Sequence, residues 1–159
     1  MLLWILYLSA LSFFSPTLPE KGPKAPSGLC EKKPAPGVHG TIRFFSGNQM
    51  PSPEGKPKTG NGVRREIGIF QVLKLDQTVA GKNPGFYSSI KGRRIRKAWS
   101  NARGCFAFHL PPGQYSMLVR EKGAWYANSF GPNNEINPIE VRSGESTSVE
   151  FSINYAAFF

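Results

Sequence analysis

A short basic segment carries the clearest chemistry in this sequence of 159 residues. Residues 92–99 read Gly-Arg-Arg-Ile-Arg-Lys-Ala-Trp and bring together Arg93, Arg94, Arg96, Lys97 and Trp99. Arginine can bind sulfate or phosphate through paired hydrogen bonds, and a tryptophan ring can stack on a sugar or a base. The segment therefore predicts a surface for anionic polymers. An edge strand that lysine and arginine protect from aggregation has the same pattern, so both interpretations stay open.

A second candidate segment combines aromatic rings with amide side chains: Trp125, Tyr126, Asn128 and Phe130, then Asn133, Asn134, Glu135 and Asn137. Carbohydrate sites use aromatic platforms and amide hydrogen bonds, which suggests a glycan site built on Trp125, Tyr126, Asn128 and Asn134. The alternative is that Trp125 and Phe130 cap the core, because packed aromatic rings bury a large area. One carboxylate among these oxygens is too few for a tight calcium site.

The sequence carries no recognisable catalytic or metal-binding motif. The two histidines, His39 and His109, have no cysteine or carboxylate at metal-ligand spacing. A Gly-x-Ser-x-Gly elbow, a P-loop and a dinucleotide fingerprint are also lacking. We therefore expect a protein that is not an enzyme and that uses neither a metal nor a cofactor.

Short β-strands are expected to position these groups. The clearest two flank Pro111-Pro112-Gly113, where the prolines end one strand and the glycine permits a reversal, so residues 104–119 predict a hairpin. Apolar residues alternate along both strands: Phe106, Phe108 and Leu110, then Tyr115, Met117 and Val119. In the last predicted strand, residues 147–155, the inward positions are Val149, Phe151, Ile153 and Tyr155.

Seven or eight short antiparallel strands follow from the whole pattern, which is typical of a β-sandwich. They are expected at residues 38–45, 64–74, 93–100, 104–110, 113–119, 125–130, 136–141 and 147–155. Two long loops, residues 46–62 and 75–91, separate the early strands. Long loops in compact domains are often functional.

The first 37 residues indicate export. Residues 1–16 contain an apolar run too short to span a membrane, which predicts a signal peptide, with an uncleaved anchor as the alternative. Residues 17–37 form a Pro/Lys-rich linker, expected to be disordered. In an exported chain Cys30 and Cys105 could form a disulfide, although spacing alone does not decide whether they pair.

Charge is distributed unevenly along the chain. The formal net charge is +10, and no acidic residue lies between Asp76 and Glu121. This polarity can attract acidic glycans, nucleic acid or a lipid surface, and it can equally serve solubility alone.

Three segments carry a recognisable pattern: Gly-Thr-Ile-Arg at residues 40–43, a turn followed by Gly-x-Phe-x-Phe at residues 101–108, and Leu-Pro-Pro-Gly-x-Tyr within residues 110–119. Together they resemble the first strand, the turn and strand, and the proline-rich motif of the carboxypeptidase regulatory-like family. The resemblance covers about residues 38–155 and is closest to single-domain exported bacterial members. It implies a transthyretin-like (prealbumin-like) Greek-key sandwich. It implies no peptidase activity, because that chemistry belongs to a separate catalytic domain.

These observations predict that residues 38–159 form a non-catalytic β-sandwich module of the periplasm, cell surface or secreted fraction. Its expected role at the cell envelope is either that of a structural accessory or the binding of a glycan or an envelope protein, with residues 46–62 and 125–130 as the expected contact surfaces. The alternative is electrostatic binding of an anionic polymer or membrane surface through residues 91–97. Nucleic acid is not an expected partner, and membrane contact is expected only through an uncleaved N-terminal segment.

Overall fold

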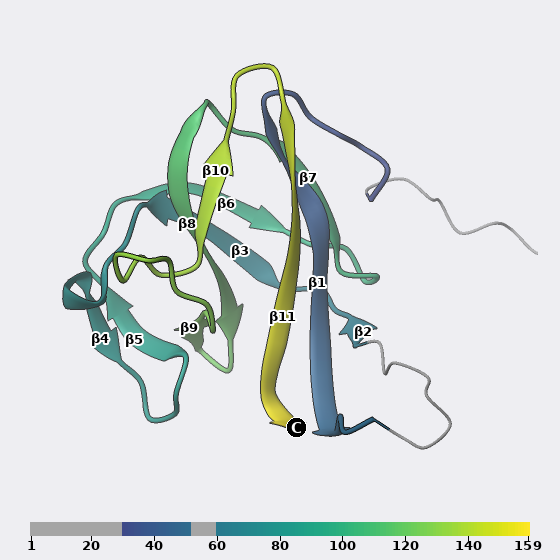
Figure 1. Ribbon diagram of the computed structural model, residues 1–159, viewed down its shortest axis with the longest axis vertical. Coiled ribbons are helices and arrows are strands. Elements are labelled where there is room, and N and C mark those ends of the chain that lie inside the picture. The colour runs from purple at the N-terminus through teal and green to yellow at the C-terminus, as the bar shows by residue number, and fades with distance from the viewer. Residues whose placement is uncertain (1–29, 52–59) are drawn as a thin grey trace, which may run out of the picture.

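The computed structural model describes residues 30–51 and 60–159, which form two β-sheets packed face to face (Figure 1). The predicted sandwich is confirmed. The expected signal peptide, most of the expected linker and the centre of the expected loop at residues 46–62 lie outside the described residues.

The small sheet is built around β1 (Gly37–Asn48). On one side β1 pairs with β11 (Ser146–Phe158), and on the other with β2 (Asn61–Gly62) and β7 (Cys105–His109). The β1–β11 pair is parallel, whereas all strands were expected to be antiparallel. A parallel pair requires a long connection. Here the whole large sheet lies between the two strands in the chain.

The large sheet has the order β4-β5-β9-β8-β3-β6, and β10 also pairs with β8. Its strands are β3 (Glu66–Gln71), β4 (Thr78–Ala80), β5 (Phe86–Ile90), β6 (Arg94–Trp99), β8 (Gly113–Glu121), β9 (Ala124–Tyr126) and β10 (Pro138–Val141).

The expectation of one long loop at residues 75–91 is wrong. This stretch contains a short 3₁₀ helix, η1 (Leu75–Gln77), and the strands β4 and β5. β5 adds to the sheet because Phe86 and Tyr87 pair with Tyr126 and Trp125 of β9. Gly85, at φ +76°, supplies the left-handed residue of the turn between β4 and β5. The short strands lack a clear period of two, which hid them in the sequence.

The expected hairpin at residues 104–119 is also wrong in its pairing. β7 pairs with β1 in the small sheet, whereas β8 pairs with β3, β9 and β10 in the large sheet. The Pro111-Pro112 turn therefore leads the chain from one sheet to the other, and the Tyr115 hydroxyl donates a hydrogen bond to the Pro111 carbonyl across it (2.9 Å). The alternation was read correctly, since Phe106, Phe108 and Leu110 are buried.

The core lies between the two sheets. The large sheet contributes Ile67, Ile69, Met117, Val119, Phe86 and Tyr126, and the small sheet contributes Val38, Ile42, Phe106, Phe108, Phe151 and Ile153. Aromatic rings meet across the interface: the centroids of Phe86 and Tyr155 are 5.0 Å apart, and those of Tyr126 and Phe151 are 6.4 Å apart. The inward positions predicted for residues 147–155 are confirmed, with Val149 and Tyr155 half-buried against the core.

A disulfide joins Cys30 to Cys105, which settles the question that spacing left open. Alternation along β7 places Cys105 opposite to the core-facing Phe106, on the outer face of the small sheet. The bond connects residues 75 positions apart and fastens the start of the described chain to β7.

Replacing both cysteines, Cys30→Ser with Cys105→Ser, is expected to lower the free energy of unfolding by about 2–4 kcal/mol, because the crosslink restricts the unfolded chain. Urea unfolding without reductant measures the difference. Reductant should destabilise the parent protein by a similar amount and leave the serine variant unchanged. Equal stability of the two proteins in the absence of reductant would contradict this account.

Candidate functional site

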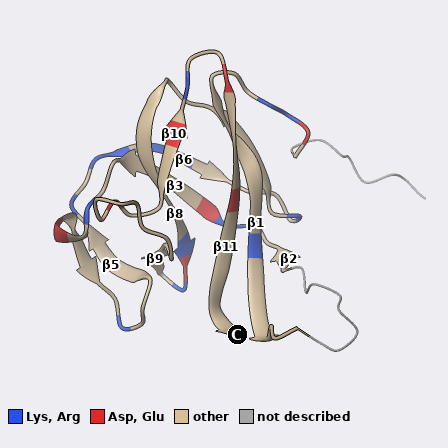
Figure 2. Ribbon diagram, viewed as in Figure 1, with Lys and Arg blue, Asp and Glu red and all other residues tan. Residues whose placement is uncertain are grey.

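The outer face of the large sheet gathers cations from β6, from β8 and from the segment that leads into β3. Antiparallel partners lie on the same face of a sheet, and the partners here are Glu66 with Trp99, Gly68 with Lys97, and Phe70 with Arg94. Arg64, two residues before Glu66, and Arg120 of β8 extend this face. We call Arg64, Arg94, Lys97, Arg120 and Trp99 the basic face; Figure 2 marks charges on β3, β6 and β8.

A β-bulge brings Arg94 onto the basic face. The register of β3 and β6 shifts between Ile69, which pairs with Arg96, and Phe70, which pairs with Arg94. Ile95 is the extra residue. Uninterrupted alternation would have placed Ile95, and not Arg94, on the same face as Lys97.

Contacts confirm that these side chains lie together. Lys97 Nζ lies 3.2 Å and Arg94 Nη1 3.9 Å from Glu66 Oε1. Arg64 Cζ and Lys97 Nζ lie 5.4 and 5.7 Å from the centroid of the Trp99 ring. Trp99 itself is 50% exposed. Two cations of the basic face, Arg94 and Lys97, thus lie beside the Glu66 carboxylate, and Arg64 and Lys97 lie beside an accessible aromatic ring.

The other cations predicted from the basic segment do not join this group. Arg96 turns the opposite way, where Cζ lies 5.3 Å from the Phe108 centroid and Nη1 donates to the His109 carbonyl oxygen (3.0 Å). It links β6 to β7 of the small sheet. Arg93 is exposed, and its carbonyl accepts a hydrogen bond from Gln71. β6 is an edge strand, as one of the two interpretations predicted.

The predicted aromatic glycan site is not assembled as one platform. Trp125 and Tyr126 are consecutive in β9 and so lie on opposite faces of the sheet. Trp125 is 8% exposed and packs edge-on against Phe70 (centroids 5.2 Å apart), with the Arg120 Cζ 5.2 Å from its ring centroid. A Cβ on Gly68 would lie 2.7 Å from the Trp125 ring, so only glycine leaves room for it.

Tyr126 faces the core and is 1% exposed. Its hydroxyl donates to Asn154 Oδ1 (2.8 Å), which also accepts a hydrogen bond from Asn128 Nδ2 (2.7 Å). Asn134 lies in a separate turn, with φ +63°. The Asn128 and Asn154 amides thus form hydrogen bonds at the end of the core. Phe130 is the exposed aromatic ring of this segment.

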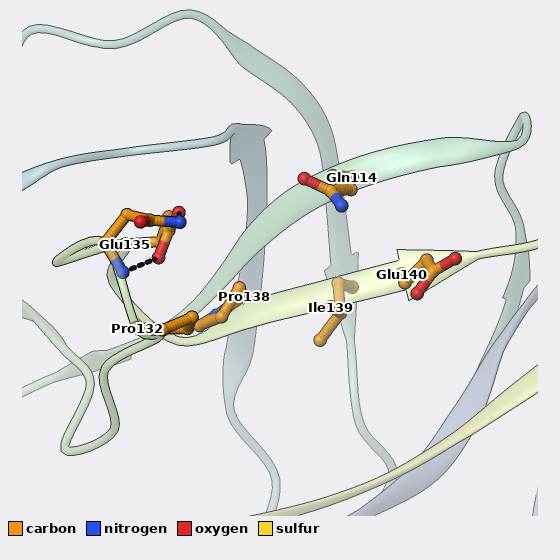
Figure 3. Close-up of a pocket in the computed structure, with 7 residues that line it drawn as sticks. Gln114, Pro132, Glu135, Pro138, Ile139 and Glu140 are labelled. Carbon is orange, nitrogen blue, oxygen red and sulfur yellow. Dashed lines mark hydrogen bonds between the residues drawn. The ribbon is translucent and has the colours of Figure 1, made fainter.

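A hollow of about 320 Å³ lies beside β10, lined by Gln114, Pro132, Asn133, Glu135, Pro138, Ile139 and Glu140. In Figure 3 the carboxylates of Glu135 and Glu140 lie at opposite ends, with Pro138 and Ile139 between them. Glu135 accepts hydrogen bonds from the side-chain amide and backbone nitrogen of Asn133 (both 2.9 Å), which lower the pKa of its carboxyl group.

A partly buried ion pair at the end of the core was not foreseen. Arg65 Nε lies 2.5 Å from Glu121 Oε2, and the Tyr155 hydroxyl donates to Glu121 Oε1 (3.1 Å). Arg65 and Glu121 lie at core-facing positions of neighbouring strands, next in phase to Ile67 and Val119. Each charged residue lies two positions from a buried residue of β3 or β8, so alternation places it on the core side. Two opposite charges at such positions are the signal that could have revealed this pair.

Among residues 30–51 and 60–159, no cluster of three or more histidine, cysteine, aspartate or glutamate side chains could hold a metal ion. His39 is buried and its Nδ1 lies 2.8 Å from Ser146 Oγ, whereas His109 is exposed. Within the same ranges, no helix has the length and apolar character needed to cross a membrane.

A scan against known protein families and a search of curated proteins found no match to this chain.

The two tryptophans of the outer face should differ in their contribution to stability. Trp125→Ala is expected to cost about 3–5 kcal/mol, because it empties a packed site, whereas Trp99→Ala should cost about 1 kcal/mol or less. Urea unfolding of both variants measures the contrast. Equal losses of unfolding free energy in the two variants would contradict the packing described for Trp125 and the exposure described for Trp99.

Three tyrosines should make stability fall at alkaline pH. Burial raises the pKa of Tyr87, Tyr126 and Tyr155 above the ordinary 10.0, and the Glu121 carboxylate adds to the rise at Tyr155. Folding therefore favours the neutral phenols. The contribution of these raised pKa values to stability is complete below about pH 10 and is lost as the pH rises through the folded-state pKa values.

Urea unfolding at a series of pH values, with tyrosinate absorbance followed in parallel, measures this loss. Tyr87→Phe should make the decline of the unfolding free energy above about pH 10 shallower, because it removes a phenol whose pKa is raised by burial alone. A decline unchanged in this variant would contradict the assignment.

Proposed function

We propose that this protein is a non-catalytic, exported β-sandwich module that binds an acidic polysaccharide of the cell envelope through the basic face. The observation that carries the proposal is the presence of four cations, Arg64, Arg94, Lys97 and Arg120, on one sheet face, where Arg64 and Lys97 lie against the half-exposed ring of Trp99. An extended chain with repeated anionic groups can contact several strands of such a face at once.

The chemistry of the side chains favours a sugar polymer with sulfate, phosphate or carboxylate groups. Guanidinium groups bind such anions through paired hydrogen bonds, and the ammonium group of Lys97 adds a point charge. Trp99 offers an aromatic surface on which a sugar ring can pack. Neighbouring strands lie about 5 Å apart, and β6 and β8 are separated only by β3, so one extended polymer can meet cations of both strands.

The disulfide supports the exported location. Structural disulfides persist in oxidising compartments such as the periplasm and the cell exterior. The apolar run within residues 1–16 points the same way. The sandwich and the motifs around Gly104 and Pro111-Pro112 are also consistent with a module of the carboxypeptidase regulatory-like type, which would be non-catalytic.

Binding to heparin, a sulfated polysaccharide, tests the proposal. The triple variant Arg64→Gln, Arg94→Gln, Lys97→Gln is expected to bind at least roughly tenfold more weakly at low salt, because it removes three contacts with the polymer. The matched control Lys32→Gln, Lys33→Gln, Lys74→Gln removes the same charge from exposed positions elsewhere and should bind nearly as the parent does. Isothermal titration calorimetry gives the affinities.

Salt tests the electrostatic contribution to binding, and a second substitution tests the contribution of the Trp99 ring. Raising the salt to about 0.5 M should weaken parent binding steeply, and Trp99→Ala should reduce affinity at either salt concentration. If the control variant loses as much affinity as the triple variant, net charge alone causes binding and the basic face is not the site. Equal binding to single-stranded DNA or to anionic vesicles would refute a polysaccharide-specific role.

A further inference from the structure

A second hollow lies at the end of the large sheet where two turns come together. Residues 81–85 join β4 to β5, and residues 122–123 join β8 to β9. The turns are neighbours because β5 pairs with β9, as the lower left of Figure 1 shows. The hollow has a volume of about 280 Å³, and its lining includes Lys82, Asn83, Phe86, Ser88, Lys122 and Ala124.

The floor of this hollow is apolar. Phe86 is buried, and its ring lies 5.0 Å from the ring of Tyr126 and 5.0 Å from that of Tyr155, measured between centroids. Phe86 lies on the core-facing side of the large sheet, opposite to the basic face. A ligand in the hollow would therefore not compete with a polymer on the basic face.

The rim is cationic. Lys82 and Lys122 line it together with the Asn83 amide, and Lys122 Nζ lies 4.4 Å from the Tyr155 ring centroid. In the described ranges 30–51 and 60–159, neither ammonium group is in an ion pair. Glu121, the neighbour of Lys122 in sequence, is engaged by Arg65 and by the Tyr155 hydroxyl. None of the described residues that line the hollow carries a carboxylate.

We propose that this hollow binds a small amphipathic anion, in which a carboxylate, sulfonate or phosphate group is attached to an apolar ring or a short alkyl chain. The anionic group accepts hydrogen bonds from Lys82 and Lys122, and the apolar part packs on Phe86 and Ala124. Both contacts are needed: the ammonium groups attract the charge, and the floor selects an apolar body over an inorganic ion. The volume suits a compact ligand.

A pair of fluorescent probes tests both requirements on the whole chain. 1-Anilinonaphthalene-8-sulfonate carries the sulfonate, and N-phenyl-1-naphthylamine has the same rings without it. The sulfonate probe is expected to bind saturably at one site, roughly tenfold more tightly than the uncharged probe. The double variant Lys82→Gln, Lys122→Gln should weaken sulfonate binding by roughly tenfold and leave binding of the uncharged probe unchanged.

Two control variants locate the site. Lys74→Gln with Lys91→Gln removes the same charge from exposed positions, and the triple variant of the basic face removes three of the four cations on the opposite side of the sheet. Both should bind the sulfonate probe as the parent does. The proposal is overturned if the double variant binds as tightly as the parent, if either control loses the same affinity, or if both probes bind equally. Thermal unfolding of each variant confirms that its fold is intact.

Discussion

The packing of the small sheet against one side of the large sheet decides which side chains of this protein can meet a partner. Because neighbouring residues of a strand point to opposite faces, burial of Ile67, Ile69, Met117 and Val119 in the core commits their neighbours to the outer face. Gly68, Phe70 and Arg120 are outward for this reason. The basic face therefore follows from the same alternation that builds the core.

The outer face of the large sheet is itself partly apolar, and this second layer supports the basic face. Leu118 and Phe70 are buried on that side, and Trp125 lies across Gly68 to cover them. Arg120 then packs on the Trp125 ring. A side chain at position 68 would displace Trp125. The glycine at this position of β3 therefore allows the tryptophan ring to pack over the strand.

The sequence was sufficient to predict the β-sandwich and most of its inward positions, because period-two alternation records burial directly. It did not reveal pairing. The turn at Pro111-Pro112 fits a hairpin and a crossing between sheets equally well, since both require the chain to reverse and both keep Phe106 and Met117 on buried faces. The strands with which β7 and β8 pair are decided by contacts with β1 and β3, which are distant in the chain.

The candidate site shows the same limit. Arg94 and Lys97 were identified as cations of one segment, but a bulge at Ile95 was needed to bring them to one face, and Arg96 was drawn into the contact with β7. Arg64 and Arg120 joined the group only through the register of β3 with its neighbours. The disulfide likewise required the N-terminal segment and β7 to be placed in space.

In the proposed binding mode, Glu66 would favour an extended ligand over a free ion. Its carboxylate holds Lys97 and Arg94 in position, so less side-chain freedom is lost when a ligand binds. The same carboxylate repels an anion at the centre of the face and competes for the two cations. A single anionic group therefore gains little by replacing Glu66 as their partner. A polymer that also contacts Arg64, Trp99 and Arg120 can offset that competition, which is the physical reason to expect an extended polyanion and not a free ion on this surface.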